Sequence, residues 1–332
     1  MIDYVDIIVG LAWGDEGKGK ISSAKAPEYN MVCRWNGGPN AGHTVYIDDK
    51  KYKTHLIPSG VFHNKPSIIG PNCVVNLTKF NEELNYLSDN GFNPYLVKIH
   101  PHAHMITDEH INYDINVLKS KLGTTGQGIA PCYTDKAARV GLLAKDYISP
   151  KFIWDGNLQG KILCEGAQSV WLDINHGNYP YVTSSETLPY GACSLGFSPK
   201  KIRDIYGVAK IYDTKSGVDP LFPESLWDNE ELNSIIEEGQ EYGSTTGRKR
   251  IVNYLNVRKL LEAINLSGCN KIIINKCDVF EKLKINKLLI NEVRNYSNFE
   301  ELKLTIMFYI LNGNTNGITT KDIVFSGDVA KI

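Results

Sequence analysis

The sequence lacks an excess of either charge, and this excludes one large group of partners. It holds 36 Lys and Arg residues against 37 Asp and Glu residues, which leaves a formal net charge of -1 over 332 residues. Nucleic acids and anionic membrane surfaces attract proteins that carry a strong positive field. We therefore expect neither as a partner, and any anion must be bound by a local cluster of groups.

Long apolar runs and a basic N-terminal segment are also missing. No stretch of about 18 uncharged apolar residues occurs, which is the length that a membrane-spanning helix needs. Asp3 and Asp6 stand where a secretory signal would carry positive charge. We therefore expect a cytoplasmic protein with no membrane partner.

Paired cysteines are missing as well. The seven cysteines are odd in number and widely spaced, and no two of them form a Cys-x-x-Cys pair. This pattern argues against a zinc site and against a framework of disulfides. The thiols, which we expect to be reduced, are Cys33, Cys73, Cys132, Cys164, Cys193, Cys269 and Cys277.

What the sequence does contain is an alternation of apolar runs and helical patterns. The helical patterns cover residues 78–89, 228–238 and 256–266. The apolar runs expected to form strands are residues 4–12, 31–36, 67–70, 96–100, 161–164, 205–212 and 271–275. This alternation predicts an α/β fold with a mostly parallel central sheet and flanking helices. No repeat or linker divides the chain, so we expect a single domain over residues 1–332. Open α/β sheets bind ligands at the carboxyl ends of their strands, and the chemistry should gather there.

The first expected strand runs into a loop rich in glycine and charge, Trp13–Lys20 (WGDEGKGK). Glycines let backbone N–H groups approach phosphate oxygens, and the start of the following helix adds positive potential. The loop predicts P-loop-like binding of a nucleoside triphosphate, although its spacing differs from Gly-x-x-x-x-Gly-Lys-Ser/Thr. Asp15 is the nearby group that could accept a proton or hold a metal ion. A purely structural turn between strand and helix is the alternative.

A second glycine-rich segment, Asn36–Thr44 (NGGPNAGHT), follows the next expected strand. An imidazole can stabilise the charge that develops on the bridging oxygen of a leaving phosphate, so His43 is a candidate for that role. A loop histidine taken alone is more often simply solvated. Two phosphate-type loops after successive strands favour the catalytic interpretation.

The segment Asn275–Asp278 (NKCD) follows an apolar strand near the far end of the sequence. The Asp278 carboxylate can accept hydrogen bonds from N1–H and the 2-amino group of guanine, a donor pair that adenine lacks, and Lys276 can cover the base. Ser326 and Gly327 could close the other side of the base. The alternative is a surface turn in which Asp278 caps a helix.

Three further segments combine glycine, hydroxyl and amide groups: residues 123–128 (GTTGQG), 165–168 (EGAQ) and 243–250 (GSTTGRKR). Hydroxyls and backbone N–H groups bind phosphate, and Arg248 and Arg250 could hold a carboxylate or phosphate by paired hydrogen bonds. Each segment alone could be an ordinary turn beside a solvated basic face. Together they indicate a set of anion-binding loops.

Taken in order, these motifs resemble the adenylosuccinate synthetase family over nearly the whole chain. The matching segments are WGDEGKGK at 13–20, NAGHT at 40–44, IPSG at 57–60, GTTGQGIAP at 123–131, EGAQ at 165–168, GNYPYVTSS at 177–185, TTGR at 245–248 and NKCD at 275–278.

The resemblance implies a GTP-dependent carbon–nitrogen ligase. Such an enzyme joins L-aspartate to C6 of a 6-oxopurine nucleotide, normally IMP, through a 6-phosphoryl intermediate, with Mg²⁺ on the phosphates. The resemblance implies that Asp15 takes the N1 proton, that His43 assists the departure of GDP, and that Lys18 neutralises phosphate charge. It also implies that Asp15 and the Gly42 carbonyl hold the metal ion, and that a homodimer supplies Arg139 across its interface.

The binding residues that the resemblance implies fall into three groups. The purine nucleotide site consists of Asp15, Lys18, Asn40, Ala41, Gly42, His43, Thr125, Arg139, Gln168, Thr183 and Arg248. The aspartate site consists of Ser244, Thr245, Thr246, Gly247, Arg248 and Arg250. The GTP site consists of Gly14, Asp15, Glu16, Gly17, Lys18, Gly19, Lys20, Gly42, His43, Thr44, Arg250, Lys276, Cys277, Asp278, Ser326 and Gly327.

The chain also departs from the common members of the family. It lacks a long helical insert after Gly141, which brings its size closer to that of archaeal and viral members, and the host cytoplasm is the expected compartment if it is viral. Residues 187–194 replace a Thr-Thr-Ala-Gly-like stretch. Residues 214–220 (TKSGVDP) replace a Thr-Arg-Val-Gly-Ala-Gly-Pro-like loop and lose its arginine.

The identity of the acceptor nucleotide is open at this point. Phage relatives that use dGMP share the Pro-Asn-Ala-Gly-His pattern of residues 39–43, so dGMP is the alternative to IMP. Those relatives usually have a small residue in place of Asp15 and a degraded guanine site, so Asp15 and the intact Asn275–Asp278 segment favour IMP. A guanine-nucleotide switch without ligase activity is a further alternative, but it leaves the second set of binding residues without a task.

Overall fold

A nine-stranded sheet forms the centre of the fold, and each pairing described within it is parallel. The computed structural model describes residues 1–48, 50–217, 219–220, 222, 229–243 and 247–327. In order across the sheet, the strands are β15 (Ile323–Phe325), β12 (Lys271–Asn275), β9 (Ile202–Lys210), β1 (Ile2–Gly10), β8 (Gly160–Glu165), β2 (Met31–Gly37), β5 (Ser67–Val75) and β6 (Val97–Ile99), with β7 (His104–Met105) also pairing with β5.

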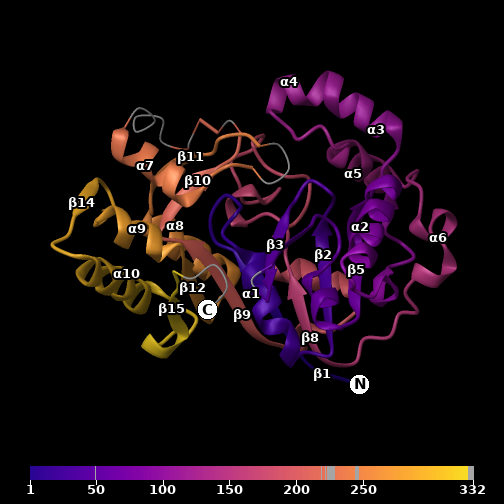
Figure 1. Cartoon of the computed structure of the whole chain (residues 1–332), viewed down its shortest axis with the longest axis horizontal. Helices are drawn as coiled ribbons and strands as arrows, with labels where there is room; N and C mark the ends of the chain where they lie inside the picture. The colour runs from indigo at the N-terminus through magenta and orange to yellow at the C-terminus, as the bar shows by residue number, and fades with distance from the viewer. Residues whose placement is uncertain (49, 218, 221, 223–228, 244–246, 328–332) are drawn as a thin grey trace.

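Helices surround this sheet in two groups (Figure 1). The group near β5 holds α2 (Leu77–Asp89), α3 (Asp108–Tyr113), α4 (Lys119–Leu122), α5 (Ile129–Ala138) and α6 (Ala144–Tyr147). The group near β12 holds α7 (Glu230–Gly239), α8 (Val257–Ser267), α9 (Cys277–Leu283) and α10 (Phe299–Gly313). Helix α1 (Lys18–Lys25) follows β1 directly, and a π-helical turn, Asp114–Leu118, joins α3 to α4.

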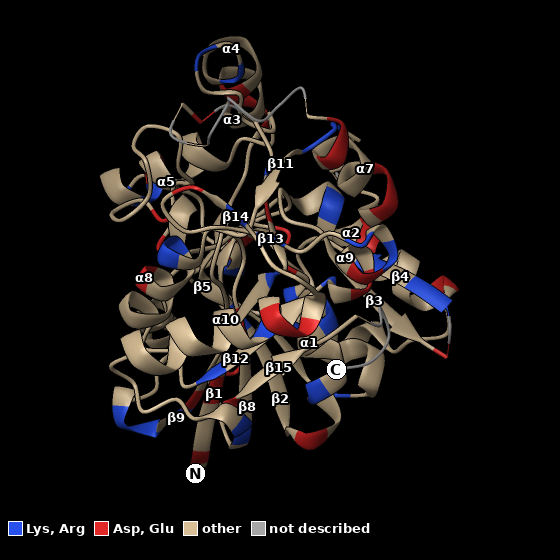
Figure 2. Cartoon of the chain, turned by 90° about the vertical axis from the view of Figure 1, so that its left-hand side faces the viewer, with Lys and Arg blue, Asp and Glu red and all other residues tan. Residues whose placement is uncertain are grey.

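Three small antiparallel ribbons complete the described structure. They are β3 (His43–Ile47) with β4 (Lys50–Thr54), β10 (Tyr212–Lys215) with β11 (Ile251–Tyr254), and β13 (Lys287–Leu289) with β14 (Val293–Asn295). No helix in the described ranges is long and apolar enough to cross a membrane. Acidic and basic residues are interspersed in the view of Figure 2, as the balanced composition predicts.

The central strands are buried on both faces, which explains their apolar sequences. Ile7 and Val9 of β1 point into the largest hydrophobic cluster, whereas Ile8 points into a separate cluster on the other face. Successive side chains of a strand point to opposite faces, so a strand covered on both sides needs an apolar residue at every position. All seven residues of β2 are buried for the same reason.

The fold class predicted from the sequence is confirmed, and one strand assignment is corrected. The apolar run 205–212 does not form one strand, because β9 ends at Lys210 and β10 begins at Tyr212. The Ile211 N–H donates to the Asn275 carbonyl at the end of β12, 2.9 Å away. Beyond that bond the chain leaves the parallel sheet and pairs with β11 in an antiparallel ribbon.

Candidate active site

The loop between β1 and α1 is built around a buried carboxylate. Glu16 is 1% exposed, and its Oε1 accepts hydrogen bonds from the Gly14 N–H at 2.8 Å and from Ser169 Oγ at 2.6 Å. Its Oε2 lies 2.7 Å from Lys18 Nζ. Burial alone would raise the pKa of Glu16, but Lys18 and these hydrogen bonds outweigh it and lower the pKa. Glu16 therefore shapes the loop from inside, while Asp15 points outward.

Asp15 is the exposed carboxylate of the loop, with a third of its side chain accessible. Its Oδ2 lies 2.8 Å from Arg250 Nε, and Arg250 Nη1 lies 2.5 Å from Glu241 Oε2. Arg250 is therefore the cation that faces this carboxylate. The structure thus places a carboxylate that could accept a proton at the carboxyl end of β1, as the sequence predicted.

His43 is buried, and a carboxylate orients it. Its Nδ1 lies 3.0 Å from Glu165 Oε1, at the end of β8, while Ser22 and Ser59 donate their hydroxyls to Glu165 Oε2 at 2.5 and 2.7 Å. Burial raises the pKa of Glu165, but His43 and the two hydroxyls overcome this and lower it to about 2. The ionised Glu165 holds one edge of the imidazole, and the Nε2 edge remains for another partner.

The two glycine-rich loops lie against each other. A Cβ placed on Gly19 would stand 3.1 Å from His43 Cβ and 3.3 Å from the Thr44 carbonyl oxygen, so only glycine allows this approach without displacement. Ala41 and Gly42 precede His43 and are half-buried. The structure therefore brings Asp15, Lys18 and His43 to one edge of the sheet.

The predicted guanine loop lies beside the phosphate loop. Asn275 Nδ2 donates to the Glu16 carbonyl at 2.8 Å, and Lys20 Nζ donates to Ser326 Oγ at 2.7 Å. A Cβ on Gly327 would stand 3.0 Å from Asp278 Cβ, which shows that the end of β15 packs on the first turn of α9. Asp278 is exposed there. The segments predicted to enclose guanine are thus neighbours, although some 50 residues separate Asp278 from Gly327 in the sequence.

Two buried polar atoms of the predicted purine nucleotide site have no hydrogen-bond partner in the part of the chain that the structure describes. Asn40 Oδ1 and Gln168 Oε1 are buried and accept no hydrogen bond from the described residues. Buried polar atoms are nearly always hydrogen-bonded, so such an atom calls for an explanation, and a bound ligand is one. Both residues were predicted to hold the purine nucleotide.

The loops that carry Thr125 and Arg248 also approach each other. A Cβ on Gly217 would stand 3.7 Å from the Gly123 carbonyl oxygen and 3.8 Å from Arg248 Nη1. Thr125 is half-buried in its loop, and Thr183, also half-buried, is fixed by a bond from its N–H to the Leu172 carbonyl at 2.8 Å. The predicted residues Ser244, Thr245 and Thr246 lie outside the described residues, and Gly247 follows them with positive φ.

Backbone strain coincides with the predicted site. Eight non-glycine residues have positive φ in the described ranges, and four of them are predicted site residues, namely Asp15, Arg139, Gln168 and Lys276. Side chains larger than hydrogen disfavour this conformation, and strained residues tend to occur where function requires a particular direction of the side chain. The strain therefore supports the choice of these residues independently of their hydrogen bonds.

A divalent metal ion would find only a few protein ligands here. Asp15 offers a partly exposed carboxylate. The second candidate ligand is the carbonyl of Gly42, which belongs to the neighbouring glycine-rich loop. No group of three or more His, Cys, Asp or Glu residues that could hold a metal occurs among the described residues. This donor set fits Mg²⁺, which commonly takes one or two carboxylates and completes its shell with phosphates and water.

Sequence reasoning missed the buried residues that hold the predicted ones in place. The main examples are Ser169, Glu241 and Lys210, and Glu165 was noted only as part of a loop motif. Position offered one signal, because Glu165 and Lys210 end the parallel strands β8 and β9. Pairings such as Ser169 with Glu16, about 150 residues apart, leave no trace in a single sequence.

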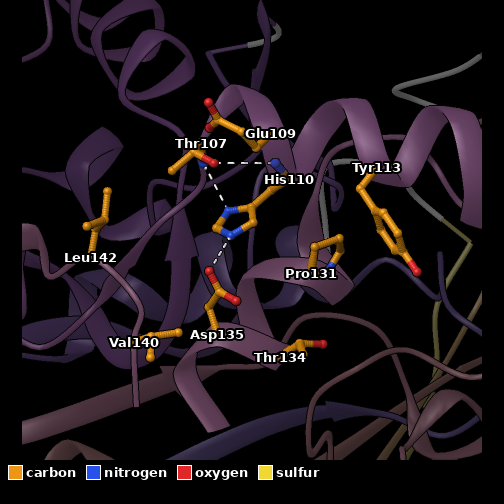
Figure 3. Close-up of a pocket in the computed structure, with 9 residues that line it drawn as sticks. All are labelled: Thr107, Glu109, His110, Tyr113, Pro131, Thr134, Asp135, Val140 and Leu142. Carbon is orange, nitrogen blue, oxygen red and sulfur yellow. Dashed lines mark hydrogen bonds and ion pairs between the residues drawn. The ribbon is translucent and has the colours of Figure 1, made fainter. Parts of the chain in front are cut away.

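No described contact joins Arg139 to this cluster. It ends α5 with a positive φ, it is exposed, and it forms no ion pair with a described residue. A hollow of about 650 Å³ lies next to it between α3 and α5 (Figure 3). His110 Nε2 and Asp135 Oδ2 meet in this hollow at 3.0 Å, and the exposed side chains of Tyr113 and Val140 line it.

The fold and the loops at the strand ends define an α/β protein whose candidate nucleotide-binding loops lie at the carboxyl edge of its sheet. A family model described as adenylosuccinate synthetase matches residues 7–156 and 150–298. The adenylosuccinate synthetase of Porphyromonas gingivalis is 36% identical, with 84% of this chain and 79% of that relative covered. That of Thermodesulfovibrio yellowstonii is 37% identical over 84% of this chain and 79% of its own length.

Two solved structures share the fold. The fully ligated adenylosuccinate synthetase of Plasmodium falciparum is 28% identical, with a TM-score of 0.81 and coverage of 93% of this chain and 95% of that chain. A cyanophage S-2L succinoaminodeoxyadenylate synthetase bound to dGMP and dATP is 19% identical, with a TM-score of 0.70 and coverage of 93% and 100%. The chain belongs to the adenylosuccinate synthetase family, which consists of ligases, and the resemblance drawn from its motifs is confirmed.

Proposed function

We propose that the protein uses GTP to join L-aspartate to C6 of IMP, forming adenylosuccinate through a 6-phosphoryl intermediate. Membership of the family supports the reaction class. The observation that carries the proposal for this site is the outward-facing carboxylate of Asp15 at the meeting point of two phosphate-type loops. Such a carboxylate can remove the N1 proton of a 6-oxopurine, which makes the 6-oxygen nucleophilic toward the γ-phosphorus of GTP.

His43 is suited to assist the departure of GDP. Glu165 can accept a hydrogen bond from Nδ1–H, and when both ring nitrogens carry a proton, Nε2–H can be directed at the oxygen that bridges the β- and γ-phosphates. Lys18 lies next to the loop glycines, although Glu16 already neutralises part of its charge. Mg²⁺, when held by Asp15 and the Gly42 carbonyl, would neutralise charge on the phosphates of GTP.

IMP is the acceptor that Asp15 and the guanine loop favour. One carboxylate suffices for a purine that carries a single N1–H donor beside its 6-oxygen, whereas guanine adds a 2-amino donor. The intact Asn275–Asp278 loop beside the phosphate loop is consistent with GTP as the phosphate donor. The match to a dGMP-bound phage structure makes dGMP the alternative to test.

A homodimer that shares Arg139 between subunits is part of the proposal. The Arg139 side chain is exposed, and the hollow beside it carries the exposed side chains of Val140 (68%) and Tyr113 (52%). Apolar side chains around a hollow are typical of a protein interface. A partner subunit bound there could receive Arg139 into its own nucleotide site.

A phosphate-release assay with GTP, L-aspartate and either IMP or dGMP tests the function. We expect release to require all three substrates and to be fastest with IMP. Faster release with dGMP would show that dGMP, and not IMP, is the acceptor. Release that proceeds unchanged without aspartate and acceptor would instead support a GTPase switch and would refute the ligase proposal.

A further inference from the structure

A buried row of alternating charges continues inward from Asp15. Lys210 Nζ lies 3.0 Å from Glu241 Oε1, and Glu241 Oε2 lies 2.5 Å from Arg250 Nη1. Arg250 Nε then reaches Asp15 Oδ2 at 2.8 Å. Glu241 and Lys210 are 1% and 3% exposed, so water screens neither of them. The signs alternate from Asp15 through Arg250 and Glu241 to Lys210, which leaves the row neutral.

Glu241 holds Arg250 by its backbone as well as by its side chain. The Arg250 N–H donates to the Glu241 carbonyl at 3.0 Å, which closes the base of the loop between them. Tyr212 adds a hydroxyl to Glu241 Oε1 at 2.7 Å, and Thr214 accepts a hydrogen bond from Lys210 at 2.7 Å. Every oxygen of the Glu241 carboxylate is therefore occupied, and its place is fixed from several sides.

The guanidinium of Arg250 uses different nitrogens for its two carboxylates. Nη1 faces the buried Glu241, and Nε faces the exposed Asp15. A base must be released before it can accept a proton or bind a metal ion, so the contact of Asp15 with Arg250 has to loosen when substrates enter. The contact with Glu241 has no such reason to break, because it lies inside the protein.

We propose that Glu241 is a positioning residue that anchors Arg250 at Nη1 while the rest of the guanidinium exchanges Asp15 for the phosphoryl group in transfer. The proposal rests on the proposed function. An arginine fixed at one nitrogen has lost most of its side-chain freedom before the reaction, so less entropy is lost when it meets the transition state. Lys210 supplies the charge that allows Glu241 to stay ionised inside the protein.

A mutant cycle in the holoenzyme tests this role, with Mg²⁺, GTP, IMP and L-aspartate present. Removing the charge in Glu241→Gln should lower kcat by about ten- to a hundredfold, the range for losing a hydrogen bond to a charged group, and leave KM for IMP within about twofold. Glu241→Gln in an Arg250→Leu background should change kcat no further, because the residue acts through Arg250. Glu237→Gln, an exposed carboxylate one turn away that bonds Tyr242, is the control and should keep wild-type kcat.

Two further measurements keep the outcome interpretable. The cycle is repeated with Lys210→Met, since Glu241→Gln alone leaves a buried lysine without its counter-ion, and thermal unfolding reports the folding of each variant. Phosphoryl transfer without aspartate is followed as scrambling of a bridging ¹⁸O label in GTP, and this rate should fall together with kcat.

If Glu241→Gln lowers kcat equally with and without Arg250, the positioning role is overturned. An unchanged kcat in Glu241→Gln, with Lys210 or with Lys210→Met, would overturn it as well. If the wild-type protein itself forms no product, the proposed function fails instead, and that result is distinct from a failure confined to the variants.

Discussion

The two sides of the active-site edge differ in how their polar groups are satisfied. On the phosphate side, Glu16 is bonded to Lys18 and Ser169, and His43 is held by Glu165. On the acceptor side, the buried oxygens of Asn40 and Gln168 have no partner among the described residues. The phosphate side therefore has its charges arranged before any ligand arrives, which suits stabilisation of a transition state. The acceptor side has buried oxygens that a bound ligand could satisfy, which suits recognition.

Replacing Asp15 should lower turnover more than any other change proposed, because Asp15 is assigned to both the phosphate side and the acceptor side. Asp15→Ala removes the proposed base and a metal contact, and we expect turnover to fall by about 10³-fold or more. Steady-state ligation with GTP, IMP and aspartate measures it. Retention of near-normal ligation by this variant would refute the assignment of the base, and an unchanged thermal unfolding transition is the control for folding.

His43 and Glu165 test the prearranged side. His43→Asn should lower kcat by about 10²- to 10³-fold while the affinity for both nucleotides stays within about threefold, because the donor acts on charge that develops in the transition state. Glu165→Gln should lower kcat less, since it leaves the imidazole present but weakly oriented. Binding is measured by titration and kcat by initial rates. A large loss of nucleotide affinity with unchanged kcat would contradict the role.

The guanine loop offers a narrower test of the same side. Asp278→Asn removes the charge from a proposed pair of hydrogen bonds to guanine, and we expect the preference for GTP over ATP to fall by about tenfold or more. The measurement is the ratio of kcat/KM for the two donors. Exposed Asp278 contributes little to the fold, so unfolding should be unchanged. An unaltered ratio would remove Asp278 from the base site.

The difference between the two sides also explains how far sequence reasoning could reach. Glycine spacing and the Asn275–Asp278 segment identify candidate ligand-binding residues, because binding phosphate and guanine requires those residue types. The supports of these residues, such as Glu165 for His43, depend on which strands become neighbours in the sheet. The break between β9 and β10 was missed for a similar reason, since a bond from Ile211 to Asn275 of another strand decides it.

Two asparagines in one segment separate recognition from support. Asn36 is 1% exposed and bonds Ala167 through both its amide atoms, at 2.9 and 3.1 Å, whereas Asn40 Oδ1 has no described partner. Asn40→Ala should raise KM for the purine nucleotide by about tenfold with little change in stability. Asn36→Ala should lower the free energy of unfolding by about 1–3 kcal/mol. Equal effects of both variants on KM would erase the distinction.

The smallest expected effect is a pH dependence of stability that arises from Glu165. Its pKa is lowered from 4.5 to about 2 in the folded protein, chiefly because His43 and the serine hydroxyls overcome the cost of burial. The folded state therefore binds the proton of Glu165 less readily than the unfolded state does. The stabilisation is complete above about pH 4.5 and is lost as the pH falls toward about 2. Glu165→Gln lacks this proton, so the difference in unfolding free energy between wild type and variant should shrink as the pH falls from about 5 to about 3. Urea unfolding across that range measures the difference. A constant difference for Glu165→Gln over the same range would show that the carboxylate is not held ionised by His43.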